Sequence, residues 1–285
     1  MRRLPNTSIV IPAYNEAESI VPVLEGLREV MASYPAKTEI IVVDDGSKDH
    51  TAEAAAGAGV TVVEHPLNKG YGAAIKTGIS RAAHEVIVIT DADGTYSNEN
   101  IPALLDLIED YDMVVGARTG ENVHIPLIRR PAKWVLNVLA NIMTSVKIPD
   151  LNSGLRAFRK ELADRFDHIL PDRFSFTTTI TLASLTNNCA VKFIPIDYFK
   201  RVGRSKIRPI HDTLNFLNLI IKTTVYMAPL RIFLPLSLFL IASGFAKMIC
   251  YDIILHHFVS DISLVMLLAG IQIGIMGFLA EILAR

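Results

Sequence analysis

Two carboxylates, one residue apart, follow an apolar stretch in the first half of the chain. Residues 88–90 read Val-Ile-Thr and run directly into Asp91-Ala92-Asp93. β-Branched residues favour a strand, and open α/β sheets bind ligands at the carboxyl ends of their strands. Mg²⁺ and Mn²⁺ take oxygen ligands and are commonly shared with substrate phosphates. The pair predicts a site for Mg²⁺ or Mn²⁺ and a diphosphate, although such pairs also cap helices or line solvated turns.

Three further predicted strands end in polar or glycine-rich loops. They span residues 8–12, 39–43 and 60–63, before the strand that ends at Asp91. Helical patterns follow the four strands at about 16–33, 49–57, 70–83 and 98–109. This alternation predicts an α/β fold, a mostly parallel sheet with helices on both faces. We therefore expect all four loops to emerge at the same edge of the sheet.

The first three loops contain residue types suited to binding a nucleotide. They are Pro12, Ala13, Tyr14, Asn15 and Glu16; Asp44, Asp45, Gly46, Ser47, Asp49 and Thr51; and Asn68, Lys69, Gly70, Gly72 and Ala73. A carboxylate such as Asp45 can accept hydrogen bonds from a base N–H or ribose hydroxyls, and glycines let the backbone approach a ligand. The alternative is purely structural: Asp44 caps the next helix and the glycines only form turns.

These loops, in this order, resemble those of the family 2 glycosyltransferases, which have the Rossmann-like GT-A fold. Two later segments resemble the polyprenyl-phosphate branch, which includes dolichol-phosphate mannose synthase. They are Asp150-Leu151-Asn152-Ser153-Gly154-Leu155-Arg156-Ala157-Phe158-Arg159 and Gly203-Arg204-Ser205-Lys206. The resemblance covers roughly residues 7–210. It implies a membrane-bound, inverting enzyme that moves a sugar from a UDP- or GDP-sugar to undecaprenyl or dolichyl phosphate.

The resemblance also implies roles for individual residues. Asp91 and Asp93 would bind the metal ion and act in catalysis with Arg118 and Lys206. The residues expected to bind the nucleotide sugar are Pro12, Tyr14, Asn15, Glu16, Asp44, Asp45, Gly46, Asn68, Lys69, Gly70, Gly72, Asp91, Ala92, Asp93, Arg204 and Lys206. Those expected at the acceptor phosphate are Arg118, Arg129, Arg130, Asn152 and Ser153. Asp150 and Asn152 could also shape the sugar site.

One position departs from the pattern of the dolichol enzymes. A glutamine often stands two residues after their second aspartate, and Thr95 stands there in this chain. The third metal ligand is therefore left open, with water or a phosphate oxygen as the alternative. A phosphate monoester has a second pKa of about 6 and is already largely anionic at neutral pH. The acceptor then needs no general base, and we expect direct in-line displacement with inversion at the sugar.

The apolar residues, 51% of the 285, are concentrated at the C-terminus. Segments at about 230–251 and 262–283 are each long enough to cross a hydrocarbon core of about 30 Å as a helix. The alternative is two buried helices of a soluble domain. Small residues at Gly270, Gly274 and Gly277 favour close helix packing. Together with the resemblance, they make a homo-oligomer plausible.

Basic residues flank the predicted spans unequally. The loop at about 252–261 has no lysine or arginine. The region before the first span contains Arg201, Arg204, Lys206, Arg208, Lys222 and Arg231. The positive-inside rule places the termini and the catalytic domain in the cytoplasm. The polar residues 1–6 do not resemble a signal peptide, and Cys189 and Cys250 imply no disulfide framework.

We therefore expect three parts: a catalytic domain at 1–208, an amphipathic interfacial helix at 209–229 and a membrane domain at 230–285. A second apolar helix, at about 131–146, would also lie in the bilayer interface; ordinary core packing is the alternative for both helices. The formal net charge of −1 excludes a globally basic nucleic-acid binder.

Three other functions remain open. A processive polysaccharide synthase is disfavoured because such enzymes usually carry a Gln-x-x-Arg-Trp segment, whereas the single tryptophan is Trp134. A family 2 enzyme with a protein or soluble-sugar acceptor would not require the two spans. A catalytically silent membrane scaffold would not require Asp45, Asp91 and Asp93. The sequence does not identify the sugar, the base or the lipid carrier.

Overall fold

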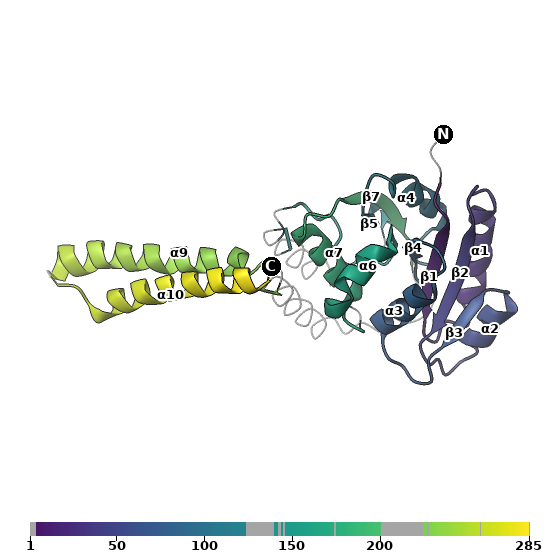
Figure 1. Ribbon diagram of the computed structural model, residues 1–285, viewed down its shortest axis with the longest axis horizontal. Coiled ribbons are helices and arrows are strands. Elements are labelled where there is room, and N and C mark those ends of the chain that lie inside the picture. Colours follow the sequence, from purple (N-terminus) through teal and green to yellow (C-terminus); the bar gives the residue numbers. More distant parts are fainter. Residues whose placement is uncertain are drawn as a thin grey trace. The chain divides into compact units, whose positions relative to one another are not determined.

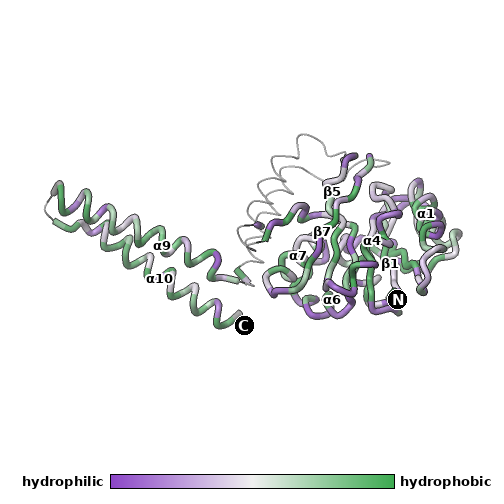
Figure 2. Tube along the Cα trace, turned by 90° about the horizontal axis from the view of Figure 1, so that it is seen from above, coloured by the Kyte–Doolittle hydropathy of each residue, from purple (hydrophilic) through white to green (hydrophobic). Residues whose placement is uncertain are grey.

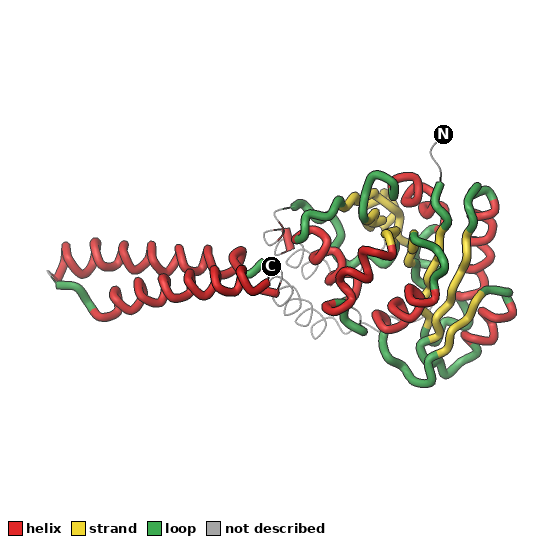
Figure 3. Tube along the Cα trace, viewed as in Figure 1, coloured by secondary structure: helices red, strands yellow, loops and turns green. Residues whose placement is uncertain are grey.

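The computed structural model describes residues 4–123, 140–141, 144, 146–173, 175–200, 225–226, 228–256 and 258–284. The chain divides into two compact units, Met1–Leu219 and Ile220–Arg285. The first contains the sheet, and the second contains two long helices (Figures 1 and 3). The predicted interfacial helices at about 131–146 and 209–229 lie largely outside the described residues.

The first unit is built on a seven-stranded sheet. Its strands are β1 (Thr7–Ala13), β2 (Thr38–Asp44), β3 (Thr61–Glu64), β4 (Val86–Ile89), β5 (Met113–Val123), β6 (Arg156–Arg159) and β7 (Val191–Tyr198). Their order is β3-β2-β1-β4-β6-β5-β7. Strands β1 to β4 are mutually parallel, β5 and β7 are parallel, and β6 is antiparallel to both of its neighbours. The mostly parallel sheet and the shared edge of the four loops are confirmed.

Short helices connect the strands. They are α1 (Ile20–Ala32), α2 (Thr51–Gly57), α3 (Tyr71–Arg81), α4 (Ile101–Leu107), α6 (Lys160–Phe166) and α7 (Phe176–Thr186), with single 3₁₀ turns η1 (Asn98–Asn100) and η3 (Asp167–Ile169). Helix α1 starts later than predicted, because residues 14–19 form a loop over the end of β1. The predicted helix at 98–109 is present as η1 followed by α4.

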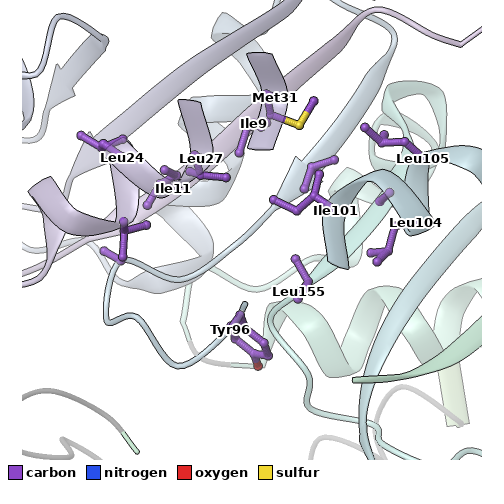
Figure 4. Close-up of a cluster of buried hydrophobic side chains, with 14 of the residues drawn as sticks. Ile9, Ile11, Leu24, Leu27, Met31, Tyr96, Ile101, Leu104, Leu105 and Leu155 are labelled. Atoms are coloured by element: carbon purple, nitrogen blue, oxygen red, sulfur yellow. The ribbon is translucent and has the colours of Figure 1, made fainter. Parts of the chain in front are cut away.

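Alternation of side chains along β1 shows that helices cover both faces of the sheet. Ile9 and Ile11 belong to a core that includes Leu24 and Leu27 of α1 and several α4 residues (Figure 4). Val10 points to the other face, where α3 lies so close that a Cβ on Gly78 would be 2.3 Å from Val10 Cγ1. Figure 1 shows α1 and α3 on opposite sides of β1 and β2.

Strand β6 was not predicted. It has only four residues, Arg-Ala-Phe-Arg, and lies inside the sheet between β4 and β5. Ala157 faces the core that contains α1, whereas Arg156 faces α7 and bonds the Thr177 carbonyl and the Thr181 hydroxyl, both at 3.0 Å. A strand with arginines at both ends forms here because its neighbours supply the ladder bonds and α7 supplies polar partners.

The second unit is a helical hairpin. Helix α9 (Leu230–Lys247) continues as a π-helical segment, η4 (Met248–His256), and α10 (Asp261–Ala284) returns alongside it. By length and composition, Leu230–Ile254 and Asp261–Leu283 are candidate membrane spans. Only 11% and 17% of their most apolar windows are buried, so most residues of these windows are at least partly exposed. Figure 2 shows both helices coloured largely as hydrophobic. The two predicted apolar helices are confirmed, with bounds within three residues of those expected, and they are candidate membrane spans. Their low burial disfavours the soluble-core alternative.

Small residues of α10 pack against α9 of the same chain. A Cβ on Gly270 would lie 2.6 Å from Ile241 Cγ1, and the Ser237 hydroxyl donates to the Gly270 carbonyl at 2.7 Å. A Cβ on Gly274 would lie 2.8 Å from the Ser237 hydroxyl. The close approach is thus confirmed within the hairpin. These glycines give no separate indication of a homo-oligomer, which stays a prediction.

Polar side chains near the turn of the hairpin bond to one another. Asp252 is 1% exposed and accepts hydrogen bonds from Lys247 Nζ at 2.8 Å, the Ser260 amide at 3.0 Å and the Ser263 hydroxyl at 2.6 Å. Near the opposite end, Glu281 accepts from the Leu230 amide at 3.4 Å. Charged groups in apolar helices are costly unless paired, so this pairing explains how the hairpin carries them.

Candidate active site

The loops that follow β1 and β2 are joined by hydrogen bonds at the carboxyl edge of the sheet. The Asn15 amide donates to the Ser47 hydroxyl at 2.9 Å, and the Asn15 side chain accepts from the Lys48 amide at 2.8 Å. The Glu16 amide donates to the Thr51 hydroxyl at 2.9 Å. Asn15 has φ 52°, a left-handed conformation that asparagine tolerates better than most residues. Two predicted nucleotide-binding motifs are therefore adjacent.

Asp44 shapes its own loop. Its Oδ1 accepts from both the amide and the hydroxyl of Ser47, so the alternative that Asp44 caps α2 is wrong. Gly46 has φ +71°, and a Cβ there would lie 2.7 Å from the Leu67 carbonyl carbon. Glycine is thus required both for the turn and for the close approach of the following loop.

Asp45 holds the glycine-rich loop in place. It is 3% exposed and accepts from the Lys69 amide at 2.9 Å, the Gly70 amide at 2.8 Å and His65 Nδ1 at 2.8 Å. His65 Nε2 lies 2.9 Å from the Thr77 hydroxyl, which completes the polar contacts of the ring. A base N–H or ribose hydroxyl that donated to Asp45 would compete with these donors. The geometry gives Asp45 an organising role that the residue type alone did not indicate.

The glycines of the third loop contact another segment of the chain. Gly70 has φ +114°, and a Cβ there would lie 2.5 Å from the Asp172 carbonyl oxygen. A Cβ on Gly72 would lie 2.1 Å from the Pro171 carbonyl oxygen, and the Ala73 amide donates to Asp172 at 2.9 Å. The Cβ sides of both glycines are thus covered by backbone, which gives a structural reason for glycine at each position. Approach of this loop to a ligand stays a prediction.

Asp91 and Asp93 follow β4 at the same edge, each with a hydroxyl donor. The Tyr71 hydroxyl donates to Asp91 Oδ1 at 2.9 Å, and the Thr95 hydroxyl donates to Asp93 Oδ1 at 2.6 Å. Asp91 is partly exposed, whereas Asp93 is 7% exposed. Burial, and then the charge of Asp91, hold the pKa of Tyr71 well above its usual value. The phenol is therefore a protonated donor at neutral pH.

The pair fits a divalent ion in the chemistry of its donors, and the backbone packs closely against one of the two carboxylates. Both residues offer hard oxygen ligands, and a Cβ on Gly154 would lie 2.8 Å from Asp91 Oδ2. Any larger residue at Gly154 would displace that carboxylate. Within the described part of the chain, no group of three or more His, Cys, Asp or Glu residues could hold a metal. Oxygens of a diphosphate or water would then complete the coordination.

Arg118 lies beyond β6, on β5, and is held by a buried carboxylate. Its Nε and Nη2 donate to the two oxygens of Asp150 at 2.6 and 2.9 Å, and its amide donates to the same side chain at 3.1 Å. The guanidinium carbon lies 5.0 Å from the centre of the Tyr198 ring. Two directions of the guanidinium are thus fixed by the protein.

Asn152 and Ser153, the other predicted acceptor residues that the structure describes, differ in accessibility. The Asn152 side-chain oxygen accepts from the Thr178 hydroxyl at 2.7 Å, which assigns its amide NH₂ to the other side. Ser153 is fully buried, and its hydroxyl donates to the Gly116 carbonyl at 2.5 Å. Contact between Ser153 and an acceptor phosphate would require that bond to break, so the geometry favours Asn152 and not Ser153.

Arg156 is an interior residue of this motif that sequence reasoning gave no role. It is fully buried and donates to Ser153, Thr177 and Thr181. Burial lowers its pKa to about 10, so the side chain remains positively charged at neutral pH. It places a fixed positive charge beneath a sheet edge that carries several carboxylates.

The remaining predicted residues are placed as follows. Pro12 is the penultimate residue of β1, and Tyr14 and Glu16 lie in the loop beyond that strand. Asn68 and Lys69 are exposed in the third loop, and Ala92 is buried between the two carboxylates. Four predicted cations lie outside the described residues: Arg129, Arg130, Arg204 and Lys206. Tyr71, His65 and the segment 171–173 were missed, because each acquires its role from a contact distant in sequence.

Comparisons with known proteins match both units. The family model "Glycosyl transferase family 2" matches residues 8–166, more than half of the chain, and "GtrB C-terminal hairpin" matches residues 228–285. The dolichyl-phosphate hexose transferase of Haloferax volcanii is 32% identical over 204 residues, 71% of this chain and 86% of the relative.

A second relative extends over both units. The dodecaprenyl-phosphate galacturonate synthase of Rhizobium johnstonii is 27% identical over 297 aligned positions, 98% of this chain and 87% of the relative. A solved structure of glucosyl-3-phosphoglycerate synthase from Mycobacterium tuberculosis, with Mn²⁺, UDP and phosphoglyceric acid, has a TM-score of 0.61 at 19% identity. It covers 77% of this chain and 78% of that one, and shows a shared fold.

Proposed function

This chain belongs to the family 2 glycosyltransferases, and from that premise we propose that it transfers a sugar from a nucleoside-diphosphate sugar to a polyprenyl phosphate, with inversion. The observation that carries the proposal is the Asp91–Asp93 pair at the carboxyl edge of a GT-A sheet, in one chain with a hairpin of two candidate membrane spans. Relatives named for dolichyl- and dodecaprenyl-phosphate transfer support the lipid acceptor.

The nucleotide end of the donor is assigned to the joined loops after β1 and β2. Tyr14, Asn15 and Glu16 lie there beside the Asp44 turn, and Asp45 holds the neighbouring glycine-rich loop through the Lys69 and Gly70 amides. Asn68 and Lys69 are exposed in that loop. This arrangement supports a nucleotide site formed by three loops, in which Asp45 acts through the loop that it holds.

The diphosphate is assigned to Asp91 and Asp93, with Mg²⁺ or Mn²⁺ as the bound ion. When bound, the ion would neutralise charge that develops on the departing nucleoside diphosphate. Tyr71 and Thr95 hold the two carboxylates in fixed orientations, so little reorganisation is needed as that charge develops. Solved GT-A neighbours that contain Mn²⁺ or Mg²⁺ support the metal requirement.

The acceptor phosphate is assigned to Arg118 and the Asn152 amide. Asp150 orients Arg118 through two of its nitrogens, which leaves Nη1 as the donor for a phosphate oxygen. Four predicted cations outside the described residues complete the proposal. Arg129 and Arg130 are assigned to the acceptor, and Arg204 and Lys206 are assigned to the donor. Since the acceptor oxygen is already anionic, catalysis comes from positioning and charge stabilisation.

The hairpin is proposed to anchor the enzyme in the bilayer, with the catalytic domain (1–208) and both termini in the cytoplasm. Basic residues precede the first span, whereas the loop at about 252–261 contains no lysine or arginine. This difference supports the orientation. The amphipathic helix at 209–229 and the helix at about 131–146 would lie at the interface. A homo-oligomer remains part of the proposal through family resemblance alone.

The test is transfer of label from a panel of UDP- and GDP-sugars to a short-chain polyprenyl phosphate in detergent. Parallel reactions contain Mg²⁺, Mn²⁺ or EDTA. We expect a chloroform-extractable product from one donor, abolished by EDTA. No lipid product from any donor, with nucleotide binding intact, would overturn the lipid-phosphate acceptor. Product formation in EDTA would overturn the metal requirement.

A further inference from the structure

A tyrosine outside the predicted site contacts one of the two proposed metal ligands. We propose that Tyr71 is a positioning residue that fixes the orientation of the Asp91 carboxylate for the metal ion. The inference rests on the proposed function, since it assigns the metal to Asp91. Its direct basis is the 2.9 Å hydrogen bond from the Tyr71 hydroxyl to Asp91 Oδ1.

The backbone of Tyr71 is held firmly enough for the phenol to act as a fixed donor. Tyr71 is the first residue of α3, directly after Gly70, whose amide is bonded to Asp45 at 2.8 Å. The next residue, Gly72, lies against the Pro171 carbonyl. A tyrosine has only two side-chain torsions, so a fixed backbone restricts the hydroxyl to few positions.

The opposite side of Asp91 is also constrained. Gly154 lies so close that a Cβ on it would be 2.8 Å from Asp91 Oδ2, and its amide donates to the Tyr96 hydroxyl at 2.7 Å. The carboxylate therefore lies between the phenol from α3 and the backbone before β6. Such outer contacts orient metal ligands and influence affinity.

Asp93 provides an internal contrast. Its orientation depends on Thr95, two residues away, through both the amide and the hydroxyl of that residue. Asp91 depends on a residue 20 positions earlier. Tyr71 directly follows the loop held by Asp45. A continuous set of contacts and covalent bonds therefore links Asp45, Gly70, Tyr71 and Asp91. Orientation of the proposed metal ligand is thus tied to the nucleotide loop.

The Tyr71→Phe variant tests this role because it removes one hydroxyl and keeps the ring. The readout is Mn²⁺ affinity, measured by electron paramagnetic resonance in the full-length protein with UDP or GDP and no acceptor. We expect affinity to fall about tenfold, the lower range for loss of an outer contact of a metal ligand. In transfer assays, the Mn²⁺ concentration for half-maximal rate should rise by a similar factor, whereas the rate at saturating Mn²⁺ changes less.

Two further proteins separate positioning from a general structural effect. Tyr34→Phe is the matched control, because the Tyr34 hydroxyl contacts the Pro5 carbonyl at 3.4 Å, near the amino end of β1; it should not change Mn²⁺ affinity. Replacing Tyr71 with 4-aminophenylalanine restores a donor at the same place and should restore affinity. This rescue would also identify the lost hydrogen bond as the cause if Tyr71→Phe lowers the melting temperature.

The outcomes for the two proposals are distinct. Wild-type protein that neither binds Mn²⁺ nor transfers sugar overturns the proposed function. Wild-type protein that does both, with Mn²⁺ affinity unchanged in Tyr71→Phe, overturns the role of Tyr71 alone. Reduced affinity that the amino analogue does not restore also overturns it.

Discussion

The sheet edge of the catalytic unit and the turn of the hairpin both bury a carboxylate, but they engage it differently. Asp45 accepts from groups 20 to 25 residues away, on loops that belong to other strand–helix units. Asp252 accepts from Lys247, Ser260 and Ser263, all within 11 residues. Asp45 therefore joins separate parts of the fold, whereas Asp252 closes one local turn.

Solvent exposure separates carboxylates with a structural role from a carboxylate that an external ligand can reach. A buried charge is tolerated when the protein supplies its partners, and both Asp45 and Asp252 meet that condition. Asp91 stands at the same edge as Asp45 yet is partly exposed, so its carboxylate is accessible to an external ligand. Exposure thus distinguishes Asp91 from Asp45. Asp93, the second proposed metal ligand, is 7% exposed and differs from Asp45 in its partner, Thr95, which is only two residues away.

The largest expected effect comes from removing the proposed metal ligand. Asp91→Asn should lower transfer at least about 10³-fold, the equivalent of about 4 kcal/mol, because the variant loses a charged ligand to the ion. The melting temperature should stay within error of wild type, since Asp91 is partly exposed. Transfer assays paired with thermal unfolding check this. A fully active variant would show that Asp91 is not a metal ligand. The proposed contrast between Asp91 as a ligand and Asp45 as an organising residue would then fail.

Asp45→Ala should act mainly on stability and on the nucleotide loop. It leaves the Lys69 and Gly70 amides and His65 without their partner, and each buried donor left unsatisfied costs about 1–3 kcal/mol. We expect the unfolding free energy to fall by about 3 kcal/mol and nucleotide affinity to fall with it. Chemical denaturation and calorimetric titration measure the two effects. Lost affinity with unchanged stability would instead indicate direct nucleotide contact.

In the hairpin, Asp252→Asn should destabilise the turn by about 2 kcal/mol, because it leaves the Lys247 charge without its counter-ion. Protease resistance of the hairpin in detergent reports this change. Nucleotide affinity should be unaffected, in contrast to Asp45→Ala. A comparable loss of nucleotide binding would show that the two buried carboxylates do not act on separate units.

A smaller effect is expected where the two helices touch. Gly270→Ala places a Cβ 2.6 Å from Ile241 Cγ1 and 3.1 Å from backbone atoms of α9, and overpacking of this kind costs about 1–3 kcal/mol. The matched variant is Gly57→Ala in α2, where a Cβ would meet nothing within 4 Å. Thermal unfolding in detergent should separate the two. Equal melting temperatures would indicate that the helices can move apart at little cost.

The smallest effect concerns pH at the nucleotide loops. Burial raises the pKa of Asp49, but bonds from Thr51 and then Ala17 outweigh it, so the pKa lies below its usual value. Stability from Asp49 is therefore present above the unfolded pKa of about 3.9 and is lost as pH falls through the folded value. The decrease in melting temperature caused by Asp49→Asn should be slight at pH 6 and smaller at pH 3. An equal difference at both values would contradict this linkage.

Local patterns predicted much of the fold. Runs of three to five residues rich in apolar side chains identified β1 to β4, and the helical patterns between them gave the parallel connections. The two long apolar segments were predicted almost to the residue, because about 20 apolar residues in a row have few structural alternatives. The motif order also sufficed for the family, although the structure does not test the roles of individual residues.

Contacts distant in sequence decided what the patterns could not. Strand β6 forms because β4 and β5 enclose it, and Ser153 is buried because β5 passes over it. Gly70 and Gly72 are required by the backbone at 171–173, a contact that their own loop does not reveal. Residue type shows which groups can form hydrogen bonds, whereas the fold determines which partner lies within hydrogen-bonding distance.

The sequence by itself thus determined the family, the alternating strands and helices, the two long apolar helices and the carboxylate pair Asp91–Asp93. Only the tertiary structure decided that Asp45 holds a loop, that Asp150 orients Arg118 and that Tyr71 reaches Asp91. The reason is physical: periodicity and apolar run length depend on neighbouring residues, whereas a hydrogen bond between separate loops depends on the path of the whole chain.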